Sequence, residues 1–185
     1  MNNIDAKMEP KFIGVLERSM KKINSIFIAL AAIMIILLVI IIVQEVIRRY
    51  FFNEPTTWAL DISRFLLVYV FFLSLAPALQ SGAHVSTDMV TSKLSPTMQW
   101  ICKQIAYGLT IIYGIILFWQ VLMPTIQVFA NNSIFPIVIE VPMKYVYVIA
   151  PIGTAQFVIT SLICLILTFY RERNVVEKPQ HINLD

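Results

Sequence analysis

The stretch from Trp58 to Leu79 reads WALDISRFLLVYVFFLSLAPAL. As a helix rising about 1.5 Å per residue, it is long enough to cross the roughly 30 Å hydrocarbon core of a bilayer. It also carries Asp61 and Arg64, three residues apart and therefore on one helix face and within reach of each other. Because an ionisable pair is costly in hydrocarbon, we expect these two side chains to face protein rather than lipid.

The residues on either side of this stretch set its limits. Asn53-Glu54-Pro55 predicts a loop followed by a helix start, since Pro is tolerated in the first helical turn. We therefore place this span at 56–79. Asp61 and Arg64 then lie roughly 9 and 13 Å along the helix from Pro55, in the outer part of the membrane. The polar segment 80–95 follows as a loop that contains Gly82, His84 and Asp88.

The composition places the whole chain in the membrane. Hydrophobic residues make up 58% and charged residues 14%, against roughly 25% charged residues in a soluble domain. The mean hydropathy is +0.78. The 185 residues suffice for about four spanning helices of some 20 residues each and for no separate soluble domain. We predict an all-α integral membrane protein with no nucleic-acid partner.

Three further spans are predicted from apolar runs, giving a single membrane domain over residues 1–185. They are 23–49, 96–122 and 142–170, followed by a tail at 171–185. Residues 5–22 combine apolar residues at helical spacing with lysines and an arginine, which predicts a short amphipathic helix on the membrane surface. The alternative is a plain extension of the first span. Pro124 is expected to kink or end the third helix. The fourth span exceeds the usual spanning length, so we expect it to tilt or to kink at Pro151-Ile152-Gly153.

The third span also carries Ala106, Thr110 and Gly114 at four-residue spacing. Small residues along one helix face allow another helix to approach closely in lipid. The spacing therefore predicts a packing ridge on this helix.

The distribution of Lys and Arg predicts the orientation. With four spans, the N-terminal segment, the middle loop and the tail share one side. Together with Lys103, at the inner end of the third span, they carry ten of the fourteen basic residues. The other side carries Arg48, Arg49 and Lys144, and Arg64 lies within a span. Because Lys and Arg are enriched in cytoplasmic loops, both termini are expected in the cytoplasm.

The residues offer little for catalysis, cofactors or an ion pathway. His84 and His181 are the two histidines, and both lie outside the spans, so no span supplies a haem ligand. Cys102 and Cys164 fall within apolar helices and form no metal-binding pattern. We predict a protein that is not an enzyme and holds no cofactor.

The charged residues near the first interhelical loop are the candidate functional set. Glu45 lies one turn from Arg48 and Arg49, which it would partly neutralise. With Asp61 and Arg64 these charges predict a clamp between the first two helices, although contact with substrate or with a partner subunit remains open. Trp58 lies near a span end, where Trp is expected as an interfacial anchor.

These residues resemble a known family. Asn53-Glu54-Pro55, Trp58-x-x-Asp61-x-x-Arg64 and Gly82-Ala83-His84 with Asp88 resemble the small membrane subunit of TRAP (tripartite ATP-independent periplasmic) transporters, of the DctQ or SiaQ type. The resemblance covers nearly the whole chain. The chain departs from the family pattern at Asp61, where Glu is more common, and at Ser81-Gly82-Ala83, where a basic residue is often found before the histidine.

The resemblance implies a non-catalytic scaffold subunit in a bacterial inner membrane. A separate large subunit would carry the transport domain and the sodium sites, and a periplasmic binding protein would deliver an organic acid such as a C4-dicarboxylate or sialic acid. Membrane lipids would contact the chain, and the charged residues would brace its helices, the partner or the docked binding protein. Two other functions stay open: a membrane anchor of a redox enzyme, and a small homo-oligomeric transporter.

Overall fold

A computed structural model describes residues 11–81, 96–135 and 141–176 of the chain. These residues are helical apart from short connections and one isolated antiparallel bridge, Ile134 with Pro142. The helices are α1 (Lys11–Phe51), α2 (Ala59–Gln80), α4 (Pro96–Asn131), α5 (Met143–Tyr147) and α6 (Ile149–Val176). Four stretches are long and apolar enough to cross a membrane: Gly14–Phe51, Ala59–Gln80, Met98–Asn131 and Met143–Tyr170. The predicted all-helical fold with four helices of spanning length is confirmed.

The first helix is longer than its predicted span. α1 continues without a break through residues 22 and 23, where a surface helix was expected to give way to the membrane segment. This part of the chain contains neither Gly nor Pro, so nothing in the backbone ends the helix there. A separate surface helix is not confirmed, and the structure shows the continuous extension instead.

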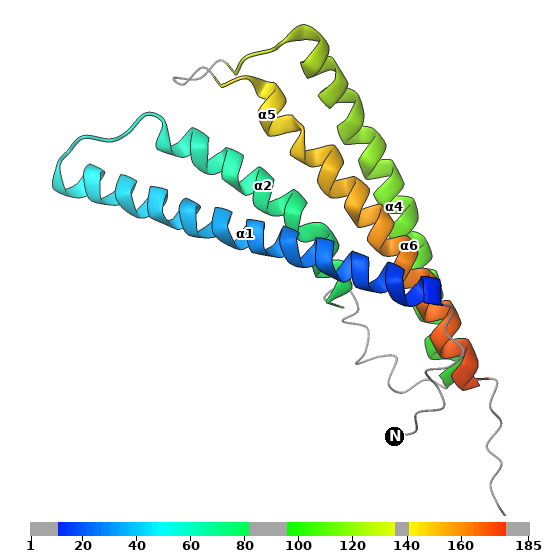
Figure 1. Cartoon of the computed structure of the whole chain (residues 1–185). Helices are drawn as coiled ribbons and strands as arrows, with labels where there is room; N and C mark the ends of the chain where they lie inside the picture. The colour runs from blue at the N-terminus through cyan, green and yellow to red at the C-terminus, as the bar shows by residue number, and fades with distance from the viewer. Residues whose placement is uncertain (1–10, 82–95, 136–140, 177–185) are drawn as a thin grey trace, which may run out of the picture.

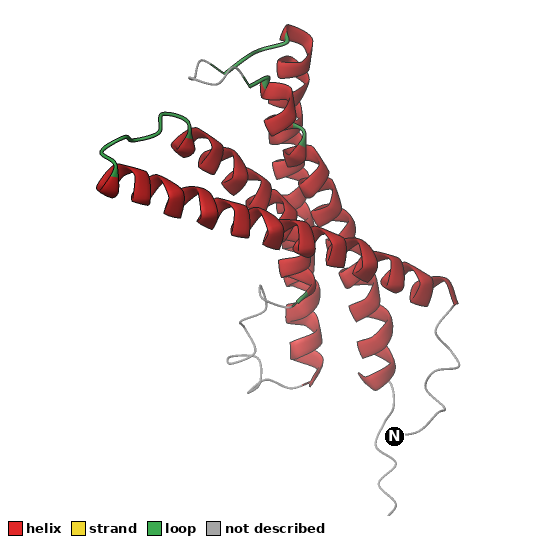
Figure 2. Ribbon diagram, turned by 60° about the vertical axis from the view of Figure 1, so that its left-hand side comes forward, coloured by secondary structure: helices red, strands yellow, loops and turns green. Residues whose placement is uncertain are grey.

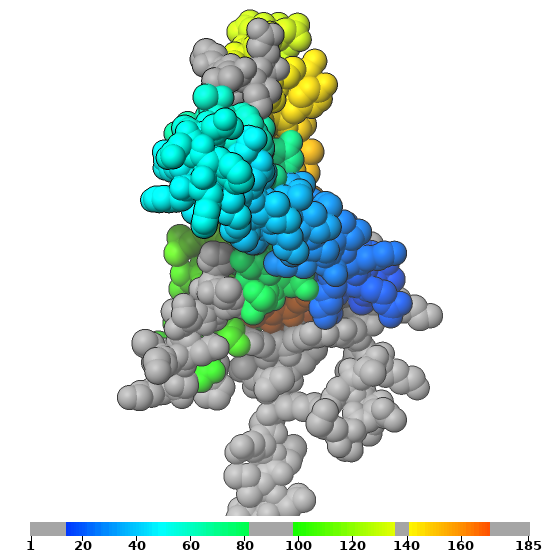
Figure 3. Space-filling model, turned by 90° about the vertical axis from the view of Figure 1, so that its left-hand side faces the viewer, coloured from blue at the N-terminus to red at the C-terminus, as the bar shows by residue number. Residues whose placement is uncertain are grey.

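α1 lies on the outside of the molecule (Figure 3), and only one narrow stripe of its residues is buried or half-buried. From Met20 onward its less exposed residues recur at alternating steps of four and three, the spacing of a coiled-coil seam. They are Met20, Asn24, Phe27, Ala31, Met34, Leu38, Ile41 and Glu45. The rest of the helix surface is exposed Ile, Leu and Val, with Ile36 59% exposed. Such a surface suits lipid or an apolar partner.

The four long helices form two antiparallel pairs that cross each other (Figures 1 and 2). α1 packs on α2, and α4 packs on α6; the two pairs are joined mainly by α6 packing on α2. Among the described helices, α2 and α4 have no Cα atoms within 8 Å of each other, although Tyr107 of α4 packs on the apolar cluster of Ala76, Leu79 and Phe157. α6 therefore lies at the centre of the molecule.

Glycines permit the closest approaches of α6 to its neighbours. A Cβ at Gly153 would lie 2.4 Å from the Phe72 carbonyl oxygen of α2, so the two backbones meet here. A Cβ at Gly114 of α4 would lie 3.0 Å from Val158 and 3.1 Å from Phe157. The predicted close packing on α4 is confirmed at Gly114. It does not extend to Ala106, which is exposed.

Pro124 does not end its helix, because α4 runs through it to Asn131. In the last span α5 and α6 meet at Val148, whose backbone stays helical with φ of −62° and ψ of −28°. A proline ring clashes with the carbonyl four residues before it, so Pro151 disturbs the helix one turn earlier, at Tyr147. The Thr125 hydroxyl of α4 donates to the Val121 carbonyl of its own helix at 2.7 Å and lies 3.4 Å from the Tyr147 carbonyl.

Candidate functional site

The charged end of the α1–α2 pair contains the predicted site residues Glu45, Arg48, Arg49, Trp58, Asp61 and Arg64. α1 ends in a tight connection in which Asn53 adopts a left-handed conformation, with φ of 53°. Asn tolerates this conformation better than most residues, because its short side chain can hydrogen-bond locally. The connection reverses the chain, so that Thr56, just before α2, lies next to Glu45 of α1.

Glu45 links the two helices at this end. Its carboxylate accepts a hydrogen bond from the Thr56 backbone N–H at 3.1 Å and another from the Thr56 hydroxyl. The sequence predicted that Glu45 partly neutralises Arg48 and Arg49, and both arginines do act electrostatically on its carboxylate. The sequence did not predict the hydrogen bonds from Thr56. The contact that the structure shows holds the end of α1 against the segment that leads into α2.

Asp61 and Arg64 do pair, but only within α2. Arg64 Nη1 lies 3.3 Å from Asp61 Oδ1. The Arg64 side chain is 73% exposed and the Asp61 side chain 16% exposed. Because this pair joins two positions of one helix, it does not clamp α2 to α1.

The remaining predicted residues make fewer contacts. Arg48 and Arg49 are exposed in the last turn of α1, and neither forms an ion pair with a described residue. Trp58 is half-buried at the start of α2, where its carbonyl accepts the Ile62 N–H. Gly82, His84 and Asp88 lie outside the described residues.

A second cluster of polar side chains, which was not predicted from the sequence, lies toward the other end of the α1–α2 pair. We call Asn24, Gln80, Gln156 and Thr160 the apex junction. The Asn24 amide donates to Gln80 Oε1 at 2.6 Å and to Thr160 Oγ1 at 3.3 Å, and its oxygen accepts from Gln156 Nε2 at 2.8 Å. Asn24 is 2% exposed and Thr160 is fully buried. The apex junction thus ties α1, α2 and α6 together where the helix pairs cross.

The buried hydroxyls of α6 are satisfied within the helix itself. Thr154 donates to the Ala150 carbonyl at 2.8 Å, and Ser161 donates to the Phe157 carbonyl at 2.8 Å. Such back-bonding lets small polar side chains enter a helix interface without losing a hydrogen bond. The described residues contain no group of three His, Cys, Asp or Glu that could hold a metal ion. Their arrangement supports helix packing and provides no relay of ionisable groups.

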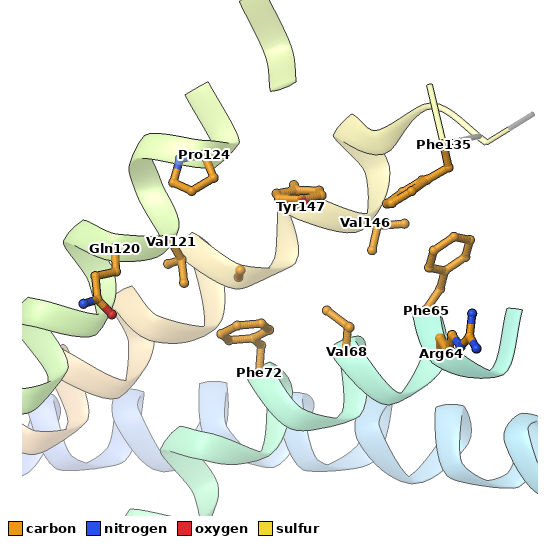
Figure 4. A pocket seen from close by; sticks show the side chains of 11 residues that line it. Arg64, Phe65, Val68, Phe72, Gln120, Val121, Pro124, Phe135, Val146 and Tyr147 are labelled. Atoms are coloured by element: carbon orange, nitrogen blue, oxygen red, sulfur yellow. The ribbon is translucent and has the colours of Figure 1, made fainter. Parts of the chain in front are cut away.

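An apolar cleft of about 380 Å³ lies between α2 and α4 (Figure 4). Phe65, Val68 and Phe72 of α2 line one wall, and Gln120, Val121 and Pro124 of α4 line the other. The floor comes from α5 and α6, and Arg64 lies at the end near Phe135. Phe65 and Phe135 close this end, with ring centroids 4.9 Å apart.

Comparison with known families identifies the protein class. Residues 38–171 match the family model described as "Tripartite ATP-independent periplasmic transporters, DctQ component". The chain belongs to the DctQ family. The predicted resemblance is confirmed, and the chain is a membrane component of a TRAP transporter. No individually curated protein matches it.

The DctQ match includes the whole charged end and the cleft, and it begins within α1. Asn24 precedes the matched region, whereas Gln80, Gln156 and Thr160 lie inside it. A signal for the apex junction exists in the sequence, because Asn24 stands at the start of an apolar run and Gln156 lies within one. Polar side chains in spanning helices are usually paired with other helices. Our sequence analysis considered only ionisable residues there.

Proposed function

We propose that this chain is the small, non-catalytic scaffold subunit of a sodium-coupled organic-acid importer. It works with a large membrane subunit, which carries the transport domain and the sodium sites, and with a periplasmic substrate-binding protein. Substrates are carboxylates such as C4-dicarboxylates or sialic acid. The complex resides in a bacterial inner membrane, with both termini of this chain in the cytoplasm, in keeping with the distribution of Lys and Arg.

The family match carries this proposal, and the geometry supports a scaffold role. The hydrogen bonds of the apex junction join neutral side chains of α1, α2 and α6, and they hold the two helix pairs together where the pairs cross. A transport pathway needs polar groups that face a water-accessible route across the membrane. The described helices offer packed seams and mostly apolar outer faces, which suits a subunit that braces another protein.

The charged end is the proposed contact region on the periplasmic side. Arg48, Arg49 and Arg64 are exposed cations that remain available to a partner or to a docked binding protein. Glu45 and Thr56 hold the α1–α2 connection in place beneath them. The loop residues Gly82, His84 and Asp88 are proposed to serve the cytoplasmic side.

The test is affinity purification of this chain from its native membrane, followed by mass spectrometry and reconstitution. We expect a much larger polytopic protein to co-purify in stoichiometric amount. Proteoliposomes that contain both chains and the binding protein should accumulate a labelled C4-dicarboxylate or sialic acid under an inward sodium gradient. A chain that purifies alone and moves solute by itself would overturn the proposal.

A further inference from the structure

We propose that the cleft between α2 and α4 is the seat of a transmembrane helix of the large subunit. This inference rests on the proposed function and adds which surface of the small subunit the partner enters. The occupant is a polypeptide helix that offers hydrogen-bonding groups, rather than a lipid acyl chain.

The cleft is a groove between two helices, and its volume of about 380 Å³ suits side chains projecting from a helix that lies over it. α2 and α4 form its walls with no Cα atoms within 8 Å of each other, and α5 and α6 form its floor. At one end the Phe65–Phe135 contact closes it, and deeper in, the close approach of Gly153 to Phe72 brings α6 against α2. A helix lying between these walls would cover apolar side chains from both pairs at once.

Gln120 decides between lipid and protein as the occupant. Its side chain lines the cleft and is exposed, within a helix long and apolar enough to cross the membrane (Figure 4). Among the described residues nothing hydrogen-bonds its amide. Acyl chains offer no hydrogen-bond partner, so an unsatisfied amide in hydrocarbon is costly. Glutamine side chains in spanning helices are typically satisfied by hydrogen bonds to another helix.

The backbone beside Gln120 adds a second unsatisfied group. Pro124 has no N–H, so the Gln120 carbonyl four residues earlier loses its helical hydrogen bond. Gln127 is also exposed and lies two turns beyond Gln120 on the same face of α4. α4 therefore presents two exposed amides on one face and a carbonyl without its usual helical N–H donor, and a helix with polar side chains can supply hydrogen bonds to them.

Arg64 at the other end of the cleft is compatible with the same occupant. Its guanidinium is largely exposed and has only the Asp61 carboxylate beside it, at 3.3 Å. A carboxylate or a helix C-terminus of the partner would suit it, and a lipid phosphate would suit it as well. The distinction therefore depends on Gln120 and not on Arg64.

Photo-crosslinking in the intact complex tests the location. A diazirine-bearing amino acid at Val68, which lines the cleft, should form an adduct with the large subunit on illumination. The matched control is Leu67, the neighbouring residue, which is 56% exposed and does not line the cleft. We expect a position-68 adduct with the mass of the large subunit and none at position 67. A lipid adduct or a dimer of this chain at position 68, with the large subunit still co-purifying, would overturn the inference.

The substitution Gln120→Leu tests the chemistry. If a partner helix satisfies the amide, the variant should recover about threefold less large subunit, the effect of losing one hydrogen bond between membrane helices. Gln44→Leu, at an exposed glutamine of α1 outside the cleft, should recover the wild-type amount. Recovery of the large subunit by Gln120→Leu at or above the wild-type level would indicate a lipid-filled cleft and overturn the inference.

These outcomes separate the inference from the proposed function. If the wild-type chain recovers no large subunit at all, the proposed function fails and the inference fails with it. Suppose instead that the large subunit co-purifies, but that position 68 gives no adduct with it and Gln120→Leu recovers as much of it as wild type. The proposed function then stands, and only the assignment of the cleft is wrong.

Discussion

The apex junction and the charged end lie at opposite ends of the same helix pair and hold polar groups in opposite ways. At the apex junction neutral side chains are buried, and Asn24 alone makes three hydrogen bonds to α2 and α6. At the charged end the arginines are exposed, and the Asp61–Arg64 pair stays within one helix. Burial makes each hydrogen bond costly to lose, whereas exposed ion pairs contribute little to stability. The first region therefore determines the fold, and the second remains available for recognition.

Replacing Asn24 by Leu should have the largest effect on folding. The change removes both donors and the acceptor of Asn24 and leaves buried groups of α6 unsatisfied. We expect a loss of about 2 kcal/mol or more in the free energy of unfolding. Steric-trapping or denaturant unfolding in bicelles would measure it.

The matched control for that prediction is Ser25→Leu, at the exposed neighbouring position of α1. Its free energy of unfolding should stay within about 0.5 kcal/mol of wild type, as for most surface substitutions. If Asn24→Leu and Ser25→Leu behave alike, the apex junction does not hold the helix pairs together.

Gly153→Ala should have the next largest effect, because it acts where the helix pairs cross. The new Cβ would meet the Phe72 carbonyl oxygen at 2.4 Å, and backbone cannot move aside as a side chain can. We expect a destabilisation of about 1–3 kcal/mol, typical of overpacking. The midpoint temperatures of thermal unfolding in detergent would rank Gly153→Ala against wild type and Asn24→Leu.

Gly108→Ala on α4 is the control for this glycine, since nothing lies within 4 Å of a Cβ there. Ala is favoured over Gly in a helix interior by up to about 1 kcal/mol, so this variant should be as stable as wild type or slightly more so. Equal destabilisation by the two substitutions would show that Gly153 matters through backbone flexibility and not through the close approach of α6 to α2.

The number and type of spanning helices were predictable, because the length of an apolar run alone indicates a helix that crosses a bilayer. The Asp61–Arg64 pair was also predictable, since three residues along a helix fix the geometry. The apex junction was not, because residues 24, 80, 156 and 160 meet only once three helices have taken their relative positions. Likewise the interruption between α5 and α6 lies at Val148, one turn before Pro151, which fits the effect of a proline on the preceding helical turn.

The Thr56 contact of Glu45 illustrates the same limit at the charged end. The sequence places Glu45 one helical turn from two arginines, which made them its expected partners. The structure adds a chain reversal at Asn53, and this brings the Thr56 N–H and hydroxyl to the carboxylate. Local spacing predicts contacts within a helix well, but it does not reveal a competing partner that arrives through a turn.

Arg64→Ala should have the smallest effect on folding and a clear effect on function. The pair with Asp61 is solvent-exposed on the arginine side, so its loss should change the free energy of unfolding by less than about 0.5 kcal/mol. If the arginine contacts the large subunit or the binding protein, recovery of the complex or the rate of uptake should still fall. Leu60→Ala, at an exposed apolar position of the same helix turn, controls for the change of size. A variant of Arg64 that unfolds early but transports normally once folded would reverse the division of roles between the charged end and the apex junction.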